Sequence, residues 1–129
     1  GNFPAIWLMP QPPAPRHPLG GEIDIFESYG THRDASQTVH SHWTLDLKQK
    51  DNPKNTFAKH YFDISKWHVY GLEWTPTQLV FLIDGEVTGA YSKATDTEAL
   101  ANGQWPFDHP FYIILNQSVR QFDLAEIIV

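Results

Sequence analysis

Three carboxylic acids lie close together in the segment Glu22-Ile-Asp24-Ile-Phe-Glu27. Side chains alternate between the two faces of a β-strand, so Glu22 and Asp24 share one face. Glu27 follows Glu22 by five positions and would point to the other face of a regular strand. A single β-bulge near Ile25 and Phe26 adds one residue and returns Glu27 to the acidic face. The spacing therefore predicts one strand with three carboxylates on the same side.

Such a trio suits acid–base and nucleophilic chemistry on a glycosidic bond. With the bulge, Glu22 and Glu27 lie about four strand steps apart, roughly 13 Å between their Cα atoms. Long side chains that lean inward over a concave sheet can bring the carboxyl groups to about 5 Å, the separation that retaining glycoside hydrolases use. Asp24 lies between them, so the three groups should titrate as a coupled unit. This coupling can keep one glutamate ionised as a nucleophile and the other protonated as an acid.

Two other interpretations of the acidic segment stay open from the pattern alone. It could be the solvent-facing side of an amphipathic strand, although clustered like charges raise one another's pKa and lower stability. A calcium site is a weaker competitor, because the segment lacks the loop glycine and the ligand spacing of an EF-hand.

Further segments surround the acidic motif in a fixed order: Pro4–Pro10, Gly21–Glu27, Trp67–Trp74, Leu79–Gly85, Trp105–Asp108 and Phe111–Asn116. In this order they resemble the catalytic region of glycoside hydrolase family 16. The resemblance extends roughly from Pro4 to Val119, which is most of the chain. The bulged form of the acidic motif is among the more specific signatures of that family.

The resemblance implies an all-β fold, a β-jelly-roll sandwich of two curved antiparallel sheets with a sugar-binding cleft on the concave face. It implies that Glu22 is the nucleophile, Glu27 the general acid/base and Asp24 the residue that tunes the nucleophile. The reaction would be hydrolysis of internal β-glycosidic bonds in a polysaccharide with retention of configuration. No cofactor is required. The resemblance is also compatible with a structural calcium ion on the face opposite the cleft, for which the sequence assigns no ligands.

The bulged motif is similar to the laminarinase, agarase and carrageenase side of the family. Trp105–Asp108 and the Ile114-Leu-Asn116 segment most resemble enzymes that cut β-1,3-glucan or mixed-linkage β-1,3-1,4-glucan. We therefore expect an endo-β-glucanase. Two alternatives are a hydrolase of a galactan such as agar, carrageenan or porphyran, and a jelly-roll that binds carbohydrate without cleaving it.

Several residues outside the motif are candidates for sugar binding. Trp7 resembles a tryptophan that lines the family's cleft and could stack on a pyranose ring, although a role in the core is an equal alternative. Trp105 is a candidate stacking residue at the rim. Asn116 and Gln117 end an apolar strand, and their amides can donate to and accept from sugar hydroxyls.

Histidines could act in the site as ligands of a metal or of the sugar. His40 and His42 are two positions apart, on one face of a predicted strand, a spacing compatible with zinc. No third ligand follows at a persuasive spacing, so we predict no metal site. We expect instead that His40 hydrogen-bonds a sugar hydroxyl near Glu27.

The elements that must position these residues are short runs of β-branched and aromatic residues between turn-forming residues, a pattern typical of an all-β domain. Asp84-Gly85 predicts a tight hairpin between two of them. Trp67 and Trp74 lie in this meander and are expected in the core. The segment 93–104 is expected to hold one short helical turn. The predicted strands are Pro4–Met9, Glu22–Tyr29, Gln37–Leu45, Thr56–Phe62, Trp67–Trp74, Leu79–Ile83, Val87–Tyr91, Phe111–Ser118 and Leu124–Val129.

Composition limits the classes of partner. The 129 residues carry a formal charge of −6, which argues against a nucleic-acid partner. No apolar run approaches the ~20 residues that a membrane-spanning helix needs. We expect a polysaccharide partner, a monomer, and a location outside the cell or on its surface, because polysaccharides do not enter cells.

The chain is short for the resemblance. Single-domain β-sandwiches often have about 200–250 residues, and the matching region begins well inside the family's domain. We therefore expect residues 1–129 to form a single, partial catalytic domain. A sheet without its neighbours exposes strand edges and apolar faces, so we predict that these residues alone fold poorly or need a partner segment.

Overall fold

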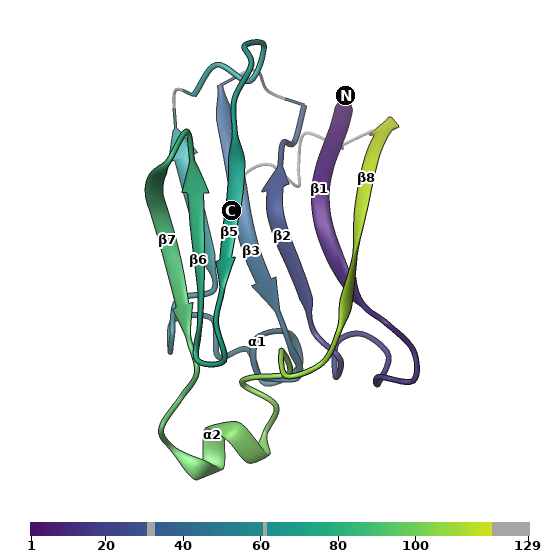
Figure 1. Ribbon diagram of the computed structural model, residues 1–129, viewed down its shortest axis with the longest axis vertical. Coiled ribbons are helices and arrows are strands. Elements are labelled where there is room, and N and C mark those ends of the chain that lie inside the picture. The colour runs from purple at the N-terminus through teal and green to yellow at the C-terminus, as the bar shows by residue number, and fades with distance from the viewer. Residues whose placement is uncertain (31–32, 61, 120–129) are drawn as a thin grey trace.

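The computed structural model describes residues 1–30, 33–60 and 62–119. Their strands form two antiparallel sheets, a larger one with the order β4-β3-β2-β1-β8 and a smaller one with the order β5-β6-β7 (Figure 1). This nearly all-β, two-sheet architecture confirms the predicted fold class. The strands are β1 (Asn2–Pro10), β2 (Glu22–Glu27), β3 (Asp34–His40), β4 (Thr56–His60), β5 (Tyr70–Trp74), β6 (Gln78–Ile83), β7 (Glu86–Ser92) and β8 (Phe111–Val119).

The predicted bulge is present in β2. Asp24 lies opposite Thr38 of β3, and Glu27 lies opposite Ser36, so three steps along β2 match two along β3. The pairing of β2 with β1 shifts at the same place. The extra residue lets both Ile25 and Phe26 bury their side chains in the protein. It thereby turns the following acid back to the face that carries the first two.

The smaller sheet is a meander held by tight turns. Asp84 and Gly85 both have positive φ, 55° and 81°, as a two-residue hairpin between β6 and β7 requires. β5 lies over β2, and β7 lies over β4. The smaller sheet therefore covers only one part of the larger sheet.

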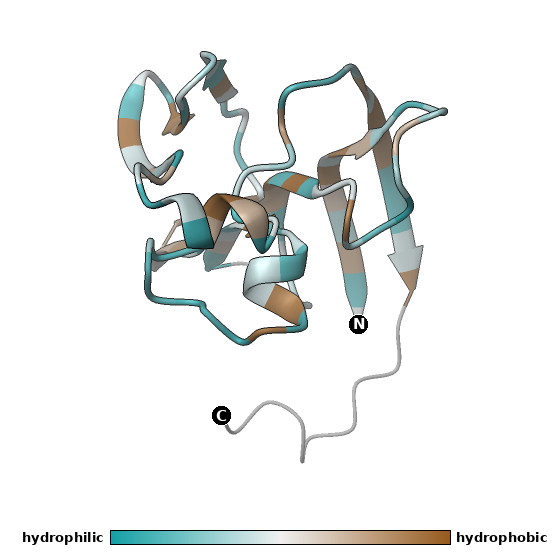
Figure 2. Ribbon diagram, turned by 90° about the horizontal axis from the view of Figure 1, so that it is seen from below, coloured by the Kyte–Doolittle hydropathy of each residue, from teal (hydrophilic) through white to brown (hydrophobic). Residues whose placement is uncertain are grey.

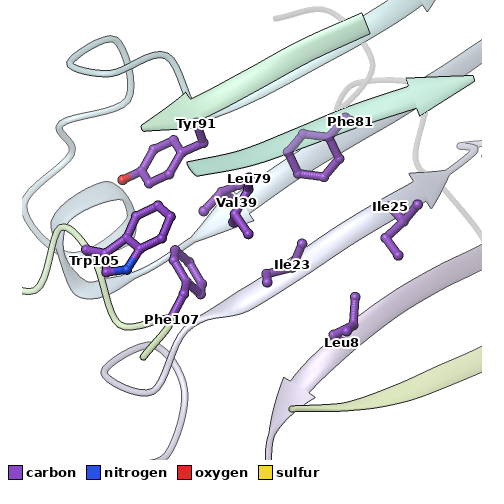
Figure 3. Packing of buried hydrophobic residues seen from close by; sticks show 9 residues of the cluster. All are labelled: Leu8, Ile23, Ile25, Val39, Leu79, Phe81, Tyr91, Trp105 and Phe107. Carbon is purple, nitrogen blue, oxygen red and sulfur yellow. The ribbon is translucent and has the colours of Figure 1, made fainter. Parts of the chain in front are cut away.

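The core lies between the two sheets (Figure 3). One wall comes from the larger sheet, the other from the smaller sheet, and one end is closed by aromatic residues that follow α2 (Thr97–Ala101). The nine buried members are Leu8, Ile23, Ile25, Val39, Leu79, Phe81, Tyr91, Trp105 and Phe107. Burial of this apolar area is the main stabilising contribution to the fold.

The helix α2 confirms the helical turn expected within residues 93–104. Its N-cap is Asp96, whose carboxylate accepts hydrogen bonds from the backbone N–H groups of Glu98 and Ala99. Among the residues that the structure describes, no helix is long and apolar enough to cross a membrane.

Two predictions on local structure were wrong. The strand predicted over Gln37–Leu45 ends at His40, because Ser41 caps a short helix, α1 (His42–Leu45), through a reciprocal pair of hydrogen bonds with Thr44. Trp67 is not in the core, since its side chain is fully exposed in the loop before β5, whereas Trp74 packs edge-on against Phe111 as expected. The strand predicted over Leu124–Val129 lies outside the described residues.

The core-facing side of β8 is largely exposed to solvent. Along β8, the aromatic and aliphatic run of residues 111–115 is followed by the polar residues Asn116, Gln117 and Ser118, and in Figure 2 the strand that leads into the grey C-terminal trace changes accordingly from mostly brown to teal and white. Ile113 pairs with Leu8 and Leu115 pairs with Ile6, so both lie on the face that the core occupies elsewhere in this sheet. They are nevertheless 66% and 72% exposed.

Candidate active site

The three carboxylates of β2 line one cleft on the face of the larger sheet opposite the core. The cleft has a volume of about 310 Å³, with walls from β1, β2 and β8. Because of the bulge, all three acids face it, as the spacing predicted. Its lining residues are Phe3, Ala5, Trp7, Glu22, Asp24, Glu27, Ile114, Asn116 and Ser118.

Glu22 begins β2 and is held on two sides. His17, from the loop between β1 and β2, places its Nε2 3.3 Å from Oε2 of Glu22. Asp24 shares a side-chain hydrogen bond with the same glutamate. Burial, followed by the charge of Asp24, raises the pKa of Glu22 from 4.5 to about 7, and the two histidines His40 and His17 oppose this rise.

Asp24 is the most deeply buried of the three acids. Its Oδ2 lies 3.2 Å from Nε2 of His40, which belongs to the neighbouring strand β3. Burial raises the pKa of Asp24 to about 7, although its hydrogen bond with Glu22 opposes the shift. Burial also lowers the pKa of His40, against the opposing pull of Glu22 and Glu27.

Glu27 ends β2 and has a different neighbour. The hydroxyl of Tyr29 donates a hydrogen bond of 2.9 Å to its Oε2. Burial, and then the charge of Asp24, raises the pKa of Glu27 to about 7. The Tyr29 hydrogen bond and the charge of His40 both work against that rise.

All three carboxyl groups therefore have pKa values of about 7. Because each ionisation makes the next one less favourable, the cluster retains protons at neutral pH. A site of this kind can offer a carboxylate and a carboxylic acid at the same pH. Retaining hydrolysis of a glycosidic bond requires this combination.

Trp7 and Asn116 form the side of the cleft next to the acids. The indole Nε1 of Trp7 donates a hydrogen bond of 2.7 Å to Oδ1 of Asn116, which lies across the β1–β8 pairing. Asn116 in turn donates to Oγ of Ser118. Both residues line the cleft, where the half-buried Trp7 leaves part of its ring accessible. Their predicted contact with a sugar stays a prediction.

The structure contradicts two of the predicted sugar-binding residues. Trp105 is only 6% exposed, and its ring lies parallel to that of Tyr91 in the core, so it cannot stack on a substrate at the rim. Gln117 is next to Asn116 in a regular strand and points to the opposite face, where its Nε2 donates to the backbone oxygen of Ser118. Neither residue lines the cleft.

His40 lies in the site, but its observed partner is Asp24. Its predicted contact with a sugar hydroxyl stays a prediction. His17 was missed, because no periodic pattern marks a histidine inside a loop rich in proline. The available signal was its position five residues before Glu22, on a loop whose prolines limit the paths of the backbone.

A metal ion is the other ligand that this cluster could contact. Glu22, Asp24 and His40 each place one potential ligand atom within 4.8 Å of the others. Two carboxylates and an imidazole can bind zinc. The same atoms already form the His40–Asp24 contact, and hydrolysis between paired carboxylic acids needs no metal. We assign the cluster to proton sharing, and the absence of a required cofactor stays a prediction.

Comparison with known proteins shows the family. The model of glycosyl hydrolases family 16 matches residues 1–120. The chain belongs to glycoside hydrolase family 16. This chain spans less than half the length of two curated relatives, a β-glucanase and a keratan-sulfate endo-1,4-β-galactosidase. It is therefore a partial domain.

Three relatives are named for different substrates. A β-glucanase from Rhodothermus marinus is 32% identical over 92% of this chain and 43% of its own length. A keratan-sulfate endo-1,4-β-galactosidase from Sphingobacterium multivorum is 30% identical over 92% of this chain and 27% of its own length. A solved structure from work on endo-acting O-glycanases of the human gut microbiota is 36% identical, with a TM-score of 0.78, over 95% of this chain and 50% of its own.

Proposed function

We propose that this chain carries the catalytic strand of an endo-acting β-glucan hydrolase that works with retention of configuration. The observation behind this proposal is the set of three coupled carboxyl groups on one face of one cleft. Membership of family 16 and the similarity to the Rhodothermus marinus β-glucanase support the substrate class. The expected linkages are β-1,3 or mixed β-1,3-1,4.

In the first step, one carboxylate oxygen of Glu22 attacks the anomeric carbon and forms a glycosyl ester. The bond from that carbon to the leaving oxygen breaks, and Glu27 gives its proton to that oxygen. Asp24 neutralises part of the change in charge at Glu22, because the two side chains share a hydrogen bond. Trp7 offers an aromatic face to the sugar ring beside the reacting bond.

In the second step, the ionised Glu27 removes a proton from water, and the water oxygen bonds to the anomeric carbon. The ester bond breaks, its electron pair returns to Glu22, and Glu27 regains its proton. Two inversions restore the original β configuration. The near-equal pKa values of about 7 allow Glu27 to act first as acid and then as base without a large energetic penalty.

The test is product analysis of the intact protein on laminarin and mixed-linkage glucan, beside the Glu22→Gln variant. We expect short oligosaccharides from the wild type only, and NMR spectra in which the β-anomer appears before mutarotation. Intact glucan after incubation with a folded wild-type protein would refute the glucanase proposal. If that protein still binds glucan, the alternative of a binding module without turnover replaces it.

The second candidate substrate is a β-galactoside-containing glycan, an alternative favoured by a specific observation. Two relatives at 30% and 36% identity are named for a keratan-sulfate endo-β-galactosidase and for O-glycanases. The same carboxylate chemistry would serve both substrates, because glucose and galactose differ only at C4, away from the reacting carbon. Incubation with keratan sulfate, mucin O-glycans and agarose in parallel decides between them: oligosaccharides released only from these replace the glucan assignment.

We also propose that the intact protein acts outside the cell or at its surface, because its polymeric substrate does not enter cells. We further propose that it is a monomer. Fractionation of the source cells and light scattering of the purified protein test these two points.

A further inference from the structure

We propose that His17 is a positioning residue for Glu22, which it contacts in addition to Asp24. This inference rests on the proposed function, in which Glu22 is the nucleophile. His17 lies in the loop that joins β1 to β2, and its Nε2 is 3.3 Å from Oε2 of Glu22. Its side chain is 34% exposed, so it stands at the edge of the acidic cluster rather than beneath it.

The contact closes a ring of four side chains. His17 contacts Glu22, Glu22 is hydrogen-bonded to Asp24, and Asp24 contacts His40. The circuit is completed by the two imidazoles, which meet edge to face with 6.2 Å between ring centroids. Glu22 is thereby constrained by two partners, one from the loop and one from its own strand.

Glu27 lies outside this ring. Among the described residues, its hydrogen-bond partner is the hydroxyl of Tyr29. The charged and titratable groups that act on Glu22 come from three elements: Asp24 and Glu27 from β2, His40 from β3 and His17 from the loop. Among the residues that the structure describes, the two glutamates therefore differ, since Glu22 has an imidazole within ion-pair distance and Glu27 has none.

A fixed carboxylate is useful in both chemical steps. A nucleophile reacts fastest when one oxygen already points at the anomeric carbon, because no rotamer search precedes attack. His17 holds Oε2, which leaves the other oxygen to form the ester bond. The same contact persists when the ester breaks and negative charge returns to Glu22. His17 itself neither gains nor loses a proton in this scheme.

Three variants of the intact protein test the role: His17→Phe, His17→Gln and, as the matched control, His42→Gln. His42 is 31% exposed and pairs with Asp46, the C-cap of the short helix α1, and it does not line the cleft. We expect His17→Phe to lower kcat by about 10-fold to 100-fold with little change in KM. His17→Gln should recover much of kcat, because its amide can donate to the same oxygen. His42→Gln should match the wild type.

The pH profile of kcat/KM separates positioning from a merely structural role. Its acid limb reports ionisation of the nucleophile, and the charge of His17 lowers the pKa of Glu22. Both His17 variants should therefore move the acid limb to higher pH, whereas His42→Gln should not. An unchanged kcat and acid limb in His17→Phe overturns the proposal, as does a loss confined to KM.

A second readout does not depend on turnover. Carbon-13 NMR titration of the Glu22 carboxyl group should show a higher pKa in His17→Gln than in the wild type or in His42→Gln. Equal titration curves in the three proteins overturn the role of His17, even where no substrate is cleaved. A protein that cleaves no glycan, but whose Glu22 titration shifts as expected, instead refutes the proposed function alone.

Discussion

The two parts of the larger sheet both carry aliphatic side chains on the core-facing side, but these side chains have very different surroundings. On the core-facing side, β2 and β3 carry Ile23 and Val39, which are completely buried beneath the smaller sheet. On the same side, β8 carries Ile113 and Leu115, which are largely exposed. Both regions therefore offer apolar side chains to the core-facing side of the sheet, although β8 opens with the unbroken aromatic and aliphatic run of residues 111–115. The difference is that the smaller sheet ends at β5, over β2.

This difference shows which parts of the site are backed by the core. The three acids stand on β2, whose other face is fixed by the core (Figure 3). Trp7 and Asn116, on β1 and β8, form the wall of the cleft where the opposite face is only partly covered. The strand that carries the three acids is therefore packed firmly against the core. The wall formed by Trp7 and Asn116 has less packing behind it and depends on further contacts.

The largest expected effect is on catalysis, and it concerns β2, the strand that packs on the core. Glu22→Gln should lower kcat by more than about 10⁴-fold, because the ester intermediate can no longer form. Glu73→Gln, a change of the exposed acid on β5, is the matched control and should keep full activity. Measured rates on a soluble glucan check both. Residual activity of a tenth or more in Glu22→Gln would remove that residue from the mechanism.

The next effect compares how much the covered strand β2 and the exposed strand β8 contribute to stability. Ile23→Ala should lower the free energy of unfolding by about 2–5 kcal/mol, because it leaves a cavity in the core. In residues 1–129 alone, Ile113→Ala should change it by less than about 1 kcal/mol, because the side chain is mostly in solvent. Chemical denaturation measures both. Equal losses would show that β8 is covered by contacts that the described residues do not make.

A third prediction concerns the exposed apolar face itself. Residues 1–129 alone should aggregate and bind hydrophobic dyes, and Ile113→Thr combined with Leu115→Thr should reduce both. Threonine is well tolerated in strands and makes the face more polar. Static light scattering against concentration is the measurement. Identical scattering from the wild type and the double variant would show that another surface causes the aggregation.

The smallest expected effect is a pH-dependent gain in stability at the acids. The pKa of Glu22 is raised to about 7 in the folded protein, so its stabilising contribution is complete below its unfolded value and disappears as pH rises through about 7. Glu22→Gln cannot ionise and should melt a few degrees above the wild type at about pH 9, with little difference at about pH 4. A difference of the same size at both pH values would contradict a raised pKa.

Much of this site could be predicted from sequence because it is local. The alternation of side chains along one strand predicts that Glu27 returns to the acidic face only through a bulge, and the structure contains that bulge. The same alternation of side chains means that Asn116 and Gln117 cannot both face the cleft, and the structure places Asn116 in it. The path of the loop that carries His17 and the packing of Trp105 depend on residues distant in sequence, which alternation does not report.

The assignment of Glu22 as nucleophile and Glu27 as acid/base is tested most directly by azide rescue. The intact Glu22→Ala and Glu27→Ala variants are incubated with azide and an aryl β-glucoside oligomer, and the products are identified by NMR. The account predicts an α-glycosyl azide from Glu22→Ala, because azide enters the space that the nucleophile has left. It predicts a β-glycosyl azide from Glu27→Ala, because azide attacks the ester on Glu22. The opposite pattern would exchange the two roles, and β-azide from both variants would exclude either glutamate as the nucleophile.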